Sequence, residues 1–193
     1  MRITNQFVYL TKIYRMKIHK GMRPQDIAVL LKIIAFGKHD WMNKDLAASL
    51  HISPSEITES LSRSQFAGLI NASRKKVFVL ALEDFLVYGL RYVFPVQPGA
   101  LVRGMPTAHA SPLLQSHFSS DEKYVWPDAQ SNERGMMIEP LYPGAAEAAK
   151  KDSIFYNLLA LCDVFRVGKV REINQAKILF QQITNHKNHV QSQ

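Results

Sequence analysis

Residues 46–70 read LAASLHISPSEITESLSRSQFAGLI. The pattern of apolar residues in this stretch predicts two short helices separated by a turn. Ser53 can cap the second helix, Pro54 suits its first turn, and Glu56 follows Ser53 at the spacing of a capping box. The second helix therefore has a sharply defined start, within a few residues of the end of the helix before it.

The second helix is predicted to have one apolar side and one polar side. Ile57 and Leu61 lie one turn apart and are expected to face the core, and Phe66 is a third apolar residue further along the helix. The side chains expected on the outer face are Ser55, Thr58, Glu59, Ser62 and Arg63. Short hydroxyl side chains allow a helix to approach another molecule closely, although a solvated face rich in serine gives the same pattern.

The residues before this pair of helices form another helical pattern. Pro24 suits a first helical position. The residues after it place four apolar side chains at the spacing of one buried stripe: Ile27, Leu30, Leu31 and Ile34. Gly37 is expected to end this helix, and Asn43 is the expected N-cap of the next one.

After Gly68 the pattern changes from helical to strand-like. Residues 69–72 predict a short strand, residues 73–76 a polar turn, and residues 77–80 a returning strand of high β-propensity. The cations at the tip of this hairpin are Arg74, Lys75 and Lys76. A basic run of this length is weak evidence alone, and its position directly after two closely spaced helices makes it specific.

The stretch from Arg23 to Leu82 resembles the winged helix-turn-helix domain of bacterial transcriptional regulators, in the broad MarR-like sense. The residues that carry the resemblance are Leu46-Ala47-Ala48, Ile52-Ser53-Pro54-Ser55, Ile57, Leu61 and Ala67-Gly68-Leu69-Ile70. His51 stands where such domains often have glycine, and histidine tolerates a left-handed backbone better than most residues. The resemblance implies a recognition helix followed by a β-wing. The same domain also occurs in proteins that bind only other proteins.

The fold class expected for the whole chain is therefore mainly α with a small β-wing (α+β). We expect a basic N-terminal arm at 1–22, a winged helix-turn-helix DNA-binding domain at 23–95, and a proline-rich irregular segment at 96–144. The last part, 145–193, is expected to be a helical region for dimerisation or sensing. Its two apolar helices can form either a self-contained core or a subunit interface.

The net charge of +8 lies almost entirely in the first half of the chain. Residues 1–95 hold 14 Lys and Arg against 7 Asp and Glu, whereas residues 96–193 hold 10 against 9. Such an excess attracts polyanions, nucleic acid first and an anionic membrane surface second, although many small proteins are basic for no specific reason. The sequence has no apolar run of 18 residues, and its single cysteine cannot form an internal disulfide. We expect a cytoplasmic protein that does not associate with a membrane.

The residues predicted to contact DNA belong to both helices and to the hairpin. Ser55, Thr58, Glu59 and Ser62 would face base edges. The residues expected to contact phosphates, either directly or from the start of a helix, are Asn43, Lys44, Ser53, Arg63, Arg74, Lys75 and Lys76. We found no catalytic motif, no cofactor motif and no metal-ligand pattern in the sequence, so we expect a protein that is not an enzyme and needs no cofactor.

These patterns favour a sequence-specific transcriptional regulator, a repressor that binds double-stranded operator DNA as a homodimer. The alternative is a protein-interaction module, such as the antitoxin-like partner of a neighbouring gene product, in which DNA binding is secondary. An enzyme acting through residues 96–144 is a distant third, because His109 and His117 lie near serines but no glycine-flanked nucleophile accompanies them.

Overall fold

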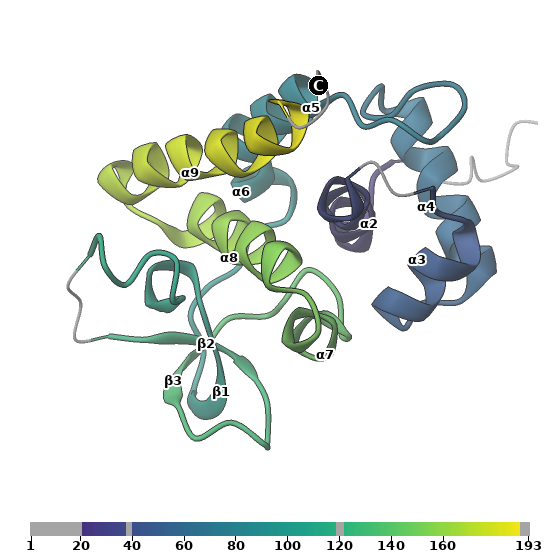
Figure 1. The fold of residues 1–193 in the computed structure, drawn as a ribbon. Helices are drawn as coiled ribbons and strands as arrows, with labels where there is room; N and C mark the ends of the chain where they lie inside the picture. The colour runs from purple at the N-terminus through teal and green to yellow at the C-terminus, as the bar shows by residue number, and fades with distance from the viewer. Residues whose placement is uncertain (1–20, 38–39, 119–121, 190–193) are drawn as a thin grey trace, which may run out of the picture.

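The computed structural model describes residues 21–37, 40–118 and 122–189. The predicted basic arm therefore lies outside the described residues except for its last two. Within the described chain, helices predominate over one small sheet, which confirms the α+β class (Figure 1). The elements are α2 (Pro24–Phe36), α3 (Asn43–Leu50), α4 (Pro54–Phe66), α5 (Val79–Asp84), the π-helical turn η1 (Phe85–Gly89), α6 (Leu90–Val93), β1 (Leu101–Thr107), the 3-10 turn η2 (Ala108–Ala110), β2 (Tyr124–Pro127), β3 (Arg134–Met137), α7 (Ala145–Lys150), α8 (Ser153–Val167) and α9 (Val170–His189).

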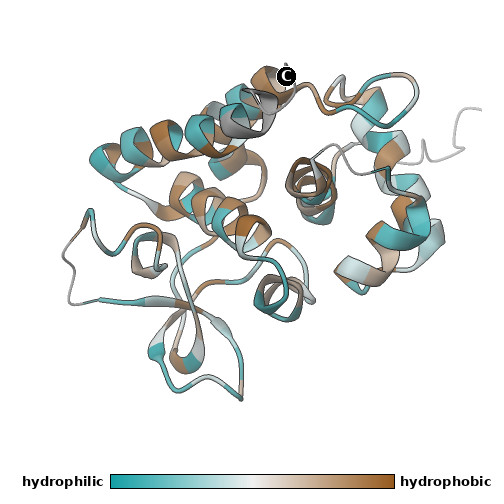
Figure 2. Ribbon diagram, in the orientation of Figure 1, coloured by the Kyte–Doolittle hydropathy of each residue, from teal (hydrophilic) through white to brown (hydrophobic). Residues whose placement is uncertain are grey.

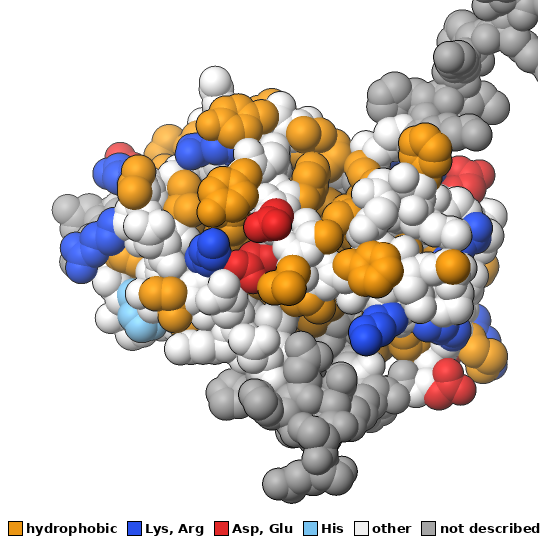
Figure 3. All heavy atoms as spheres, turned by 90° about the horizontal axis from the view of Figure 1, so that it is seen from above, with side chains coloured by type: hydrophobic (Ala, Val, Ile, Leu, Met, Phe, Trp, Pro, Cys, Tyr) orange, Lys and Arg blue, Asp and Glu red, His pale blue; other side chains and the backbone are white. Residues whose placement is uncertain are grey.

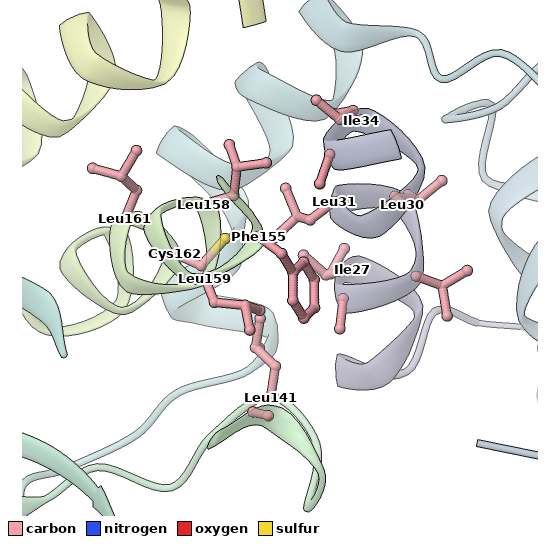
Figure 4. Packing of buried hydrophobic residues seen from close by; sticks show 14 of the residues in the cluster. Ile27, Leu30, Leu31, Ile34, Leu141, Phe155, Leu158, Leu159, Leu161 and Cys162 are labelled. Carbon is pink, nitrogen blue, oxygen red and sulfur yellow. The ribbon is translucent and has the colours of Figure 1, made fainter. Parts of the chain in front are cut away.

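Helix α2 lies between the α3–α4 pair and α8. Its predicted apolar stripe is buried, and the burial extends around most of the helix. Ile27 and Leu31 of α2 lie beside Phe155 of α8 (Figure 4), and all three have no exposed surface. The hydropathy colouring shows α2 as strongly apolar and the outer sides of α3 and α4 as polar (Figure 2). The α3–α4 pair is thus attached to the rest of the protein through α2.

The two closely spaced helices form where the sequence predicted them. His51 follows α3 with φ 55° and ψ 38°, so it occupies the left-handed region expected for this turn. The Ser53 hydroxyl accepts a hydrogen bond from the Glu56 amide at 3.3 Å, as expected of an N-cap. The cap expected at Asn43 was wrong by one residue, because Asn43 is already helical and Met42 precedes the helix.

The apolar side of α4 is confirmed at two of its three positions. Ile57 is fully buried and Leu61 is 2% exposed. Phe66 is instead 73% exposed, because it lies five residues after Leu61 and so falls outside the i, i+4 stripe that faces α2. Ser60 and Ser64 occupy the buried positions on the same side of the helix.

The hairpin after α4 is smaller than predicted. Its strands pair through one antiparallel bridge, between Ile70 and Val77. The returning strand predicted at 77–80 was wrong beyond its first two residues, because α5 begins at Val79. Leu82, Leu86 and Leu90 are all fully buried, and their regular spacing is that of a helix. Burial of these leucines therefore overrides the β-propensity of the preceding residues.

The irregular structure expected at 96–144 was wrong in part, because this segment contains the sheet. Strand β1 pairs antiparallel with both β2 and β3, and β2 pairs parallel with β3, which closes the three strands on themselves. Gly104 allows this closure, since a Cβ added there would lie 2.1 Å from the carbonyl oxygen of Trp126. Gly135 is equally tight, at 2.5 Å from the carbonyl oxygen of Lys123.

The C-terminal helices supply the centre of the core. The Asp152 carboxylate caps α8 by accepting hydrogen bonds from the Ile154 and Phe155 amides at 3.0 Å each. Buried residues from α2 through α9 form one continuous apolar cluster. Among the described residues, no helix has the length and apolar character needed to cross a membrane.

Candidate nucleic-acid interface

The outer face of α4 presents hydroxyl groups, and two of them donate hydrogen bonds to backbone carbonyls of the same helix. The Thr58 hydroxyl donates to the Pro54 carbonyl at 2.9 Å, and the Ser62 hydroxyl donates to the Thr58 carbonyl at 2.8 Å. The hydroxyls of Ser53 and Ser55 lie 3.0 Å apart. A hydroxyl whose proton is used within the helix still has a lone pair with which to accept a hydrogen bond. These groups therefore suit the amino groups of cytosine or adenine.

The first turn of α3 lies against this face. The Asn43 side-chain amide donates to the Thr58 hydroxyl at 3.2 Å, so one predicted site residue positions another. Lys44 is exposed and has no partner among the described residues. Glu59 is also exposed, with 64% of its side-chain surface accessible. The structure thus brings together Asn43, Lys44, Thr58 and Glu59 along the α3–α4 pair.

Arg63 is not part of this face, and the prediction that it points outward was wrong. Only 9% of its side chain is exposed. Its Nε and Nη2 donate to Asp26 Oδ2 and Oδ1, each at 2.8 Å, in a bidentate pair with α2. Nη2 also lies 2.7 Å from Glu56 Oε1, and Nη1 lies 3.4 Å from Glu59 Oε2.

The physical reason for the burial of Arg63 lies in α2. Asp26 is fully buried, and a buried carboxylate requires a charged and hydrogen-bonded partner. The hydrogen bond to Asp26, and then that to Glu56, raise the pKa of Arg63 above its usual value even though burial opposes this. Arg63 therefore remains charged and ties α4 to α2. The sequence of α4 alone does not show this role of Arg63, which follows from the position of Asp26 on α2.

The hairpin cations have defined positions. Arg74 has a left-handed backbone, with φ 59°, and its Nε donates to Gln65 Oε1 at 2.7 Å. The ammonium group of Lys75 donates to the Trp41 carbonyl oxygen and lies 4.1 Å from the centre of the Trp41 ring. These contacts hold the hairpin against the end of α4 and against the chain before α3.

Lys76 differs from the other two cations. It is exposed, and its side chain forms no hydrogen bond, ion pair or cation–π contact with another described residue. It lines a groove with apolar residues from the start of α5 and the end of α2.

Asn71 shapes the hairpin in a way that the sequence did not indicate. Its Oδ1 accepts hydrogen bonds from the amides of Lys75 and Lys76, at 2.9 and 3.0 Å. This side chain shapes the turn that carries the cations. The dipeptide Asn71-Ala72 had been assigned to a strand, although asparagine at such a position favours a turn.

The remaining candidate groups are structural. Cys162 is fully buried, and burial raises the pKa of its thiol well above the usual value. His109 is 8% exposed, and its Nε2 lies 2.7 Å from the Glu122 carbonyl oxygen. In the part of the chain that the structure describes, no three His, Cys, Asp or Glu side chains are grouped as metal ligands.

Comparisons of the chain with protein-family models, with curated proteins and with solved structures give no match.

Proposed function

We propose that this chain is a DNA-binding transcriptional regulator, a repressor that binds operator DNA as a homodimer. The observation that supports this proposal best is the exposed polar face of α4. Only three residues separate the end of α3 from the start of α4. A helix presented in this way fits the major groove, with the outward residues of its first turns at base edges. On this reading the helix-turn-helix and the small hairpin form a winged-helix reader.

The residues proposed to contact DNA divide into two groups. Thr58, Glu59 and Ser62 would lie at base edges, and Asn43 would hold Thr58 in place. Lys44, Arg74 and Lys75 would contact phosphates and fix the orientation of the protein on the duplex. Arg63 would act indirectly, because its pair with Asp26 sets the angle at which α4 leaves the protein surface.

The test is a binding titration of the purified chain with duplex DNA from upstream of its own gene and with an unrelated duplex, at one fixed salt concentration. A specific regulator binds the first at least about a thousandfold more tightly than the second. Equal, weak binding to both would contradict sequence-specific regulation.

A second candidate function is favoured by the charge of α4. Arg63 is buried in an ion pair, and the exposed charge on the polar face of α4 is the carboxylate of Glu59. Such a face suits a protein partner as well as DNA. Under this alternative the chain is an interaction module, and a partner encoded beside it would co-purify in a defined ratio while DNA binding stayed nonspecific.

A further inference from the structure

A groove of about 770 Å³ lies between the hairpin, α2, α5 and α9. It is lined by Ile33, Ile34, Gly37, the run from Lys75 to Ala81, and Thr184. Its charged lining residues are two lysines, with no acid among them. The groove therefore suits apolar side chains accompanied by negative charge.

The surface beside the groove is unusually apolar. Leu80 is 77% exposed and Phe78 is 46% exposed, although both border a groove that could bury them. Tyr88 and Tyr92, one turn apart on the continuation of α5, are 64% and 78% exposed. Figure 3, which views the molecule from above, shows hydrophobic side chains spread over this face with basic and acidic side chains among them. An apolar area of this kind, rimmed by polar residues, marks an interaction site.

Two exposed charged residues of opposite sign flank Leu80 in the sequence. Lys76 lies four residues before it and Asp84 four residues after it. Both are exposed, and neither forms an ion pair or a side-chain hydrogen bond among the described residues, although Asp84 lies within electrostatic range of Lys177. In an isologous two-fold contact, residue i meets residue j while j meets i. A two-fold axis beside Leu80 would be required to bring the Asp84 of each copy to the Lys76 of the other, with Leu80 displaced from the axis towards the groove of that other copy.

We propose that this surface, comprising the groove, Leu80 and Asp84, binds a second copy of the same chain. Each copy inserts Leu80, flanked by Phe78, at the groove of the other, and Asp84 supplies the negative charge that the groove lacks. The groove and the exposed Leu80 side chain lie next to each other on one copy, so the same surface can serve both copies of a self-complementary interface. This inference deepens the homodimer part of the proposed function, and it holds or fails independently of DNA binding.

The proposal moves the interface away from the region predicted from sequence. Helix α8, which the sequence left open as a subunit interface, is buried in the core of a single chain, with Phe155, Leu158 and Phe165 at 0–2% exposure. It has no apolar face left for a partner. Of the two C-terminal helices, α9 borders the groove, through Thr184.

The test is sedimentation velocity of the full chain at several protein concentrations without DNA. The unmodified chain is expected to be a dimer, and Leu80→Glu is expected to raise the dimer dissociation constant by at least about tenfold. Leu101→Glu is the matched control, because Leu101 is 63% exposed on β1, which does not line the groove. Circular dichroism confirms that each variant is folded.

Charge reversal tests whether Asp84 of one copy pairs with Lys76 of the other. Asp84→Lys and Lys76→Glu should each weaken the dimer. The double variant should recover most of the lost dimer affinity, because the two charges have then exchanged places and can still pair. A monomeric unmodified chain overturns the proposal and leaves the groove to another protein. A dimer that survives Leu80→Glu, or dissociates with Leu101→Glu, places the interface elsewhere and also overturns it. If a variant lost the dimer but kept specific DNA binding, only the homodimer part of the proposed function would be refuted.

Discussion

Arg63 of α4 and Asp26 of α2 form a bidentate ion pair, with both N–O distances at 2.8 Å, although 37 residues separate them in the sequence. Both side chains are almost completely buried. Because two hydrogen bonds join the guanidinium fork to the two carboxylate oxygens, the pair constrains the rotation of α4 as well as its distance from α2. The polar face of α4 points outward because Arg63 is held inside.

Asp26→Ala is therefore expected to destabilise the protein. It leaves the Arg63 guanidinium buried with only Glu56 and Glu59 as partners, and breaking a buried pair typically costs about 3–5 kcal/mol. Urea unfolding measures the change. Glu133→Ala is the control, because the Lys123–Glu133 pair is about half exposed and such a pair contributes about 0–1 kcal/mol. Similar losses in the two variants would show that the Arg63–Asp26 pair is not structural.

The pair between Lys32 and Asp152 predicts how stability depends on pH. Burial alone raises the pKa of Asp152, but the hydrogen bond from Lys32 at 2.8 Å and those from the α8 amides outweigh it and lower the pKa below the usual value. A carboxylate with a lowered folded-state pKa contributes stability that is complete above its unfolded pKa, near 4. That contribution is lost as the pH falls from about 4 through the lower folded-state pKa.

Asp152→Asn should remove this contribution. At neutral pH we expect a loss of about 1.5–3 kcal/mol, because Lys32 is 5% exposed and loses its charged acceptor. As the pH falls from about 4 through the lowered folded-state pKa of Asp152, the stability of the variant should approach that of the parent, since the parent then loses the same charge. Denaturation midpoints measured from neutral to acidic pH give both quantities. A constant difference between the two proteins across the whole range would contradict the assignment.

The helical half of the fold could be predicted from the sequence because its signals are local. Pro24, Ser53 and the left-handed His51 mark helix boundaries through the properties of single residues and their neighbours. The buried face of α4 followed from the spacing of Ile57 and Leu61. Burial of Arg63 depends on Asp26 of α2, 37 residues away in the sequence, so periodicity could not reveal it.

Residues 124–127 and 136–138 could be read from the sequence as short strands or docking segments, whereas β1 was missed for a different reason. Strand β1 contains Gly104 and Pro106, residues that predict turns rather than strands. Gly104 is required by the close approach of another strand, and Pro106 pairs opposite Val125. Both facts depend on pairing with β2, more than fifteen residues further along the chain. No local pattern contains that information.

Gly104→Ala tests this account of the closed sheet. The added Cβ would lie 2.1 Å from the carbonyl oxygen of Trp126, so the strands must separate, at a cost of about 1–3 kcal/mol or more. Gly99→Ala is the control, because the nearest atom there, 3.3 Å away, is the terminal methyl group of the flexible Met137. Thermal unfolding of both variants measures the difference. If both changes were tolerated, the closure of the sheet would not depend on Gly104.

The hairpin cations should differ in the salt dependence of DNA binding. Each phosphate contact contributes about 0.9 to the slope of log affinity against log salt concentration. Removal of all three cations was expected from the sequence to flatten this slope by about two to three units. The proposed dimer refines this expectation, because it assigns Lys76 to the second copy.

Single substitutions separate these roles. Arg74→Ala and Lys75→Ala should each lower the slope by about 0.9, whereas Lys76→Ala should leave the slope as it is. The measurement is a binding titration at several salt concentrations with one duplex. A slope unchanged by Arg74→Ala and Lys75→Ala would remove the hairpin from the DNA interface, and a lower slope with Lys76→Ala would return Lys76 to it.

The buried and exposed sides of α4 should respond differently to substitution. Leu61 is 2% exposed, so Leu61→Ala leaves a cavity and should lower stability by about 2–5 kcal/mol. DNA binding would then weaken only through loss of the folded protein. The side chain of Glu59 is 64% exposed, and the Ser62 hydroxyl bonds only within its own helix. Glu59→Ala and Ser62→Ala should therefore change stability by no more than about 0.5 kcal/mol.

The same two surface variants should alter recognition if α4 reads DNA sequence. Loss of a specific base contact typically costs about 1–3 kcal/mol of binding free energy on the cognate operator and little on unrelated duplex. Binding to both duplexes at one salt concentration, together with unfolding of each variant, separates recognition from stability. Thr58→Ala extends the test, because it also removes the acceptor of Asn43. Surface variants that fold normally and bind both duplexes like the parent would show that α4 does not read sequence, and would favour a protein partner for this face.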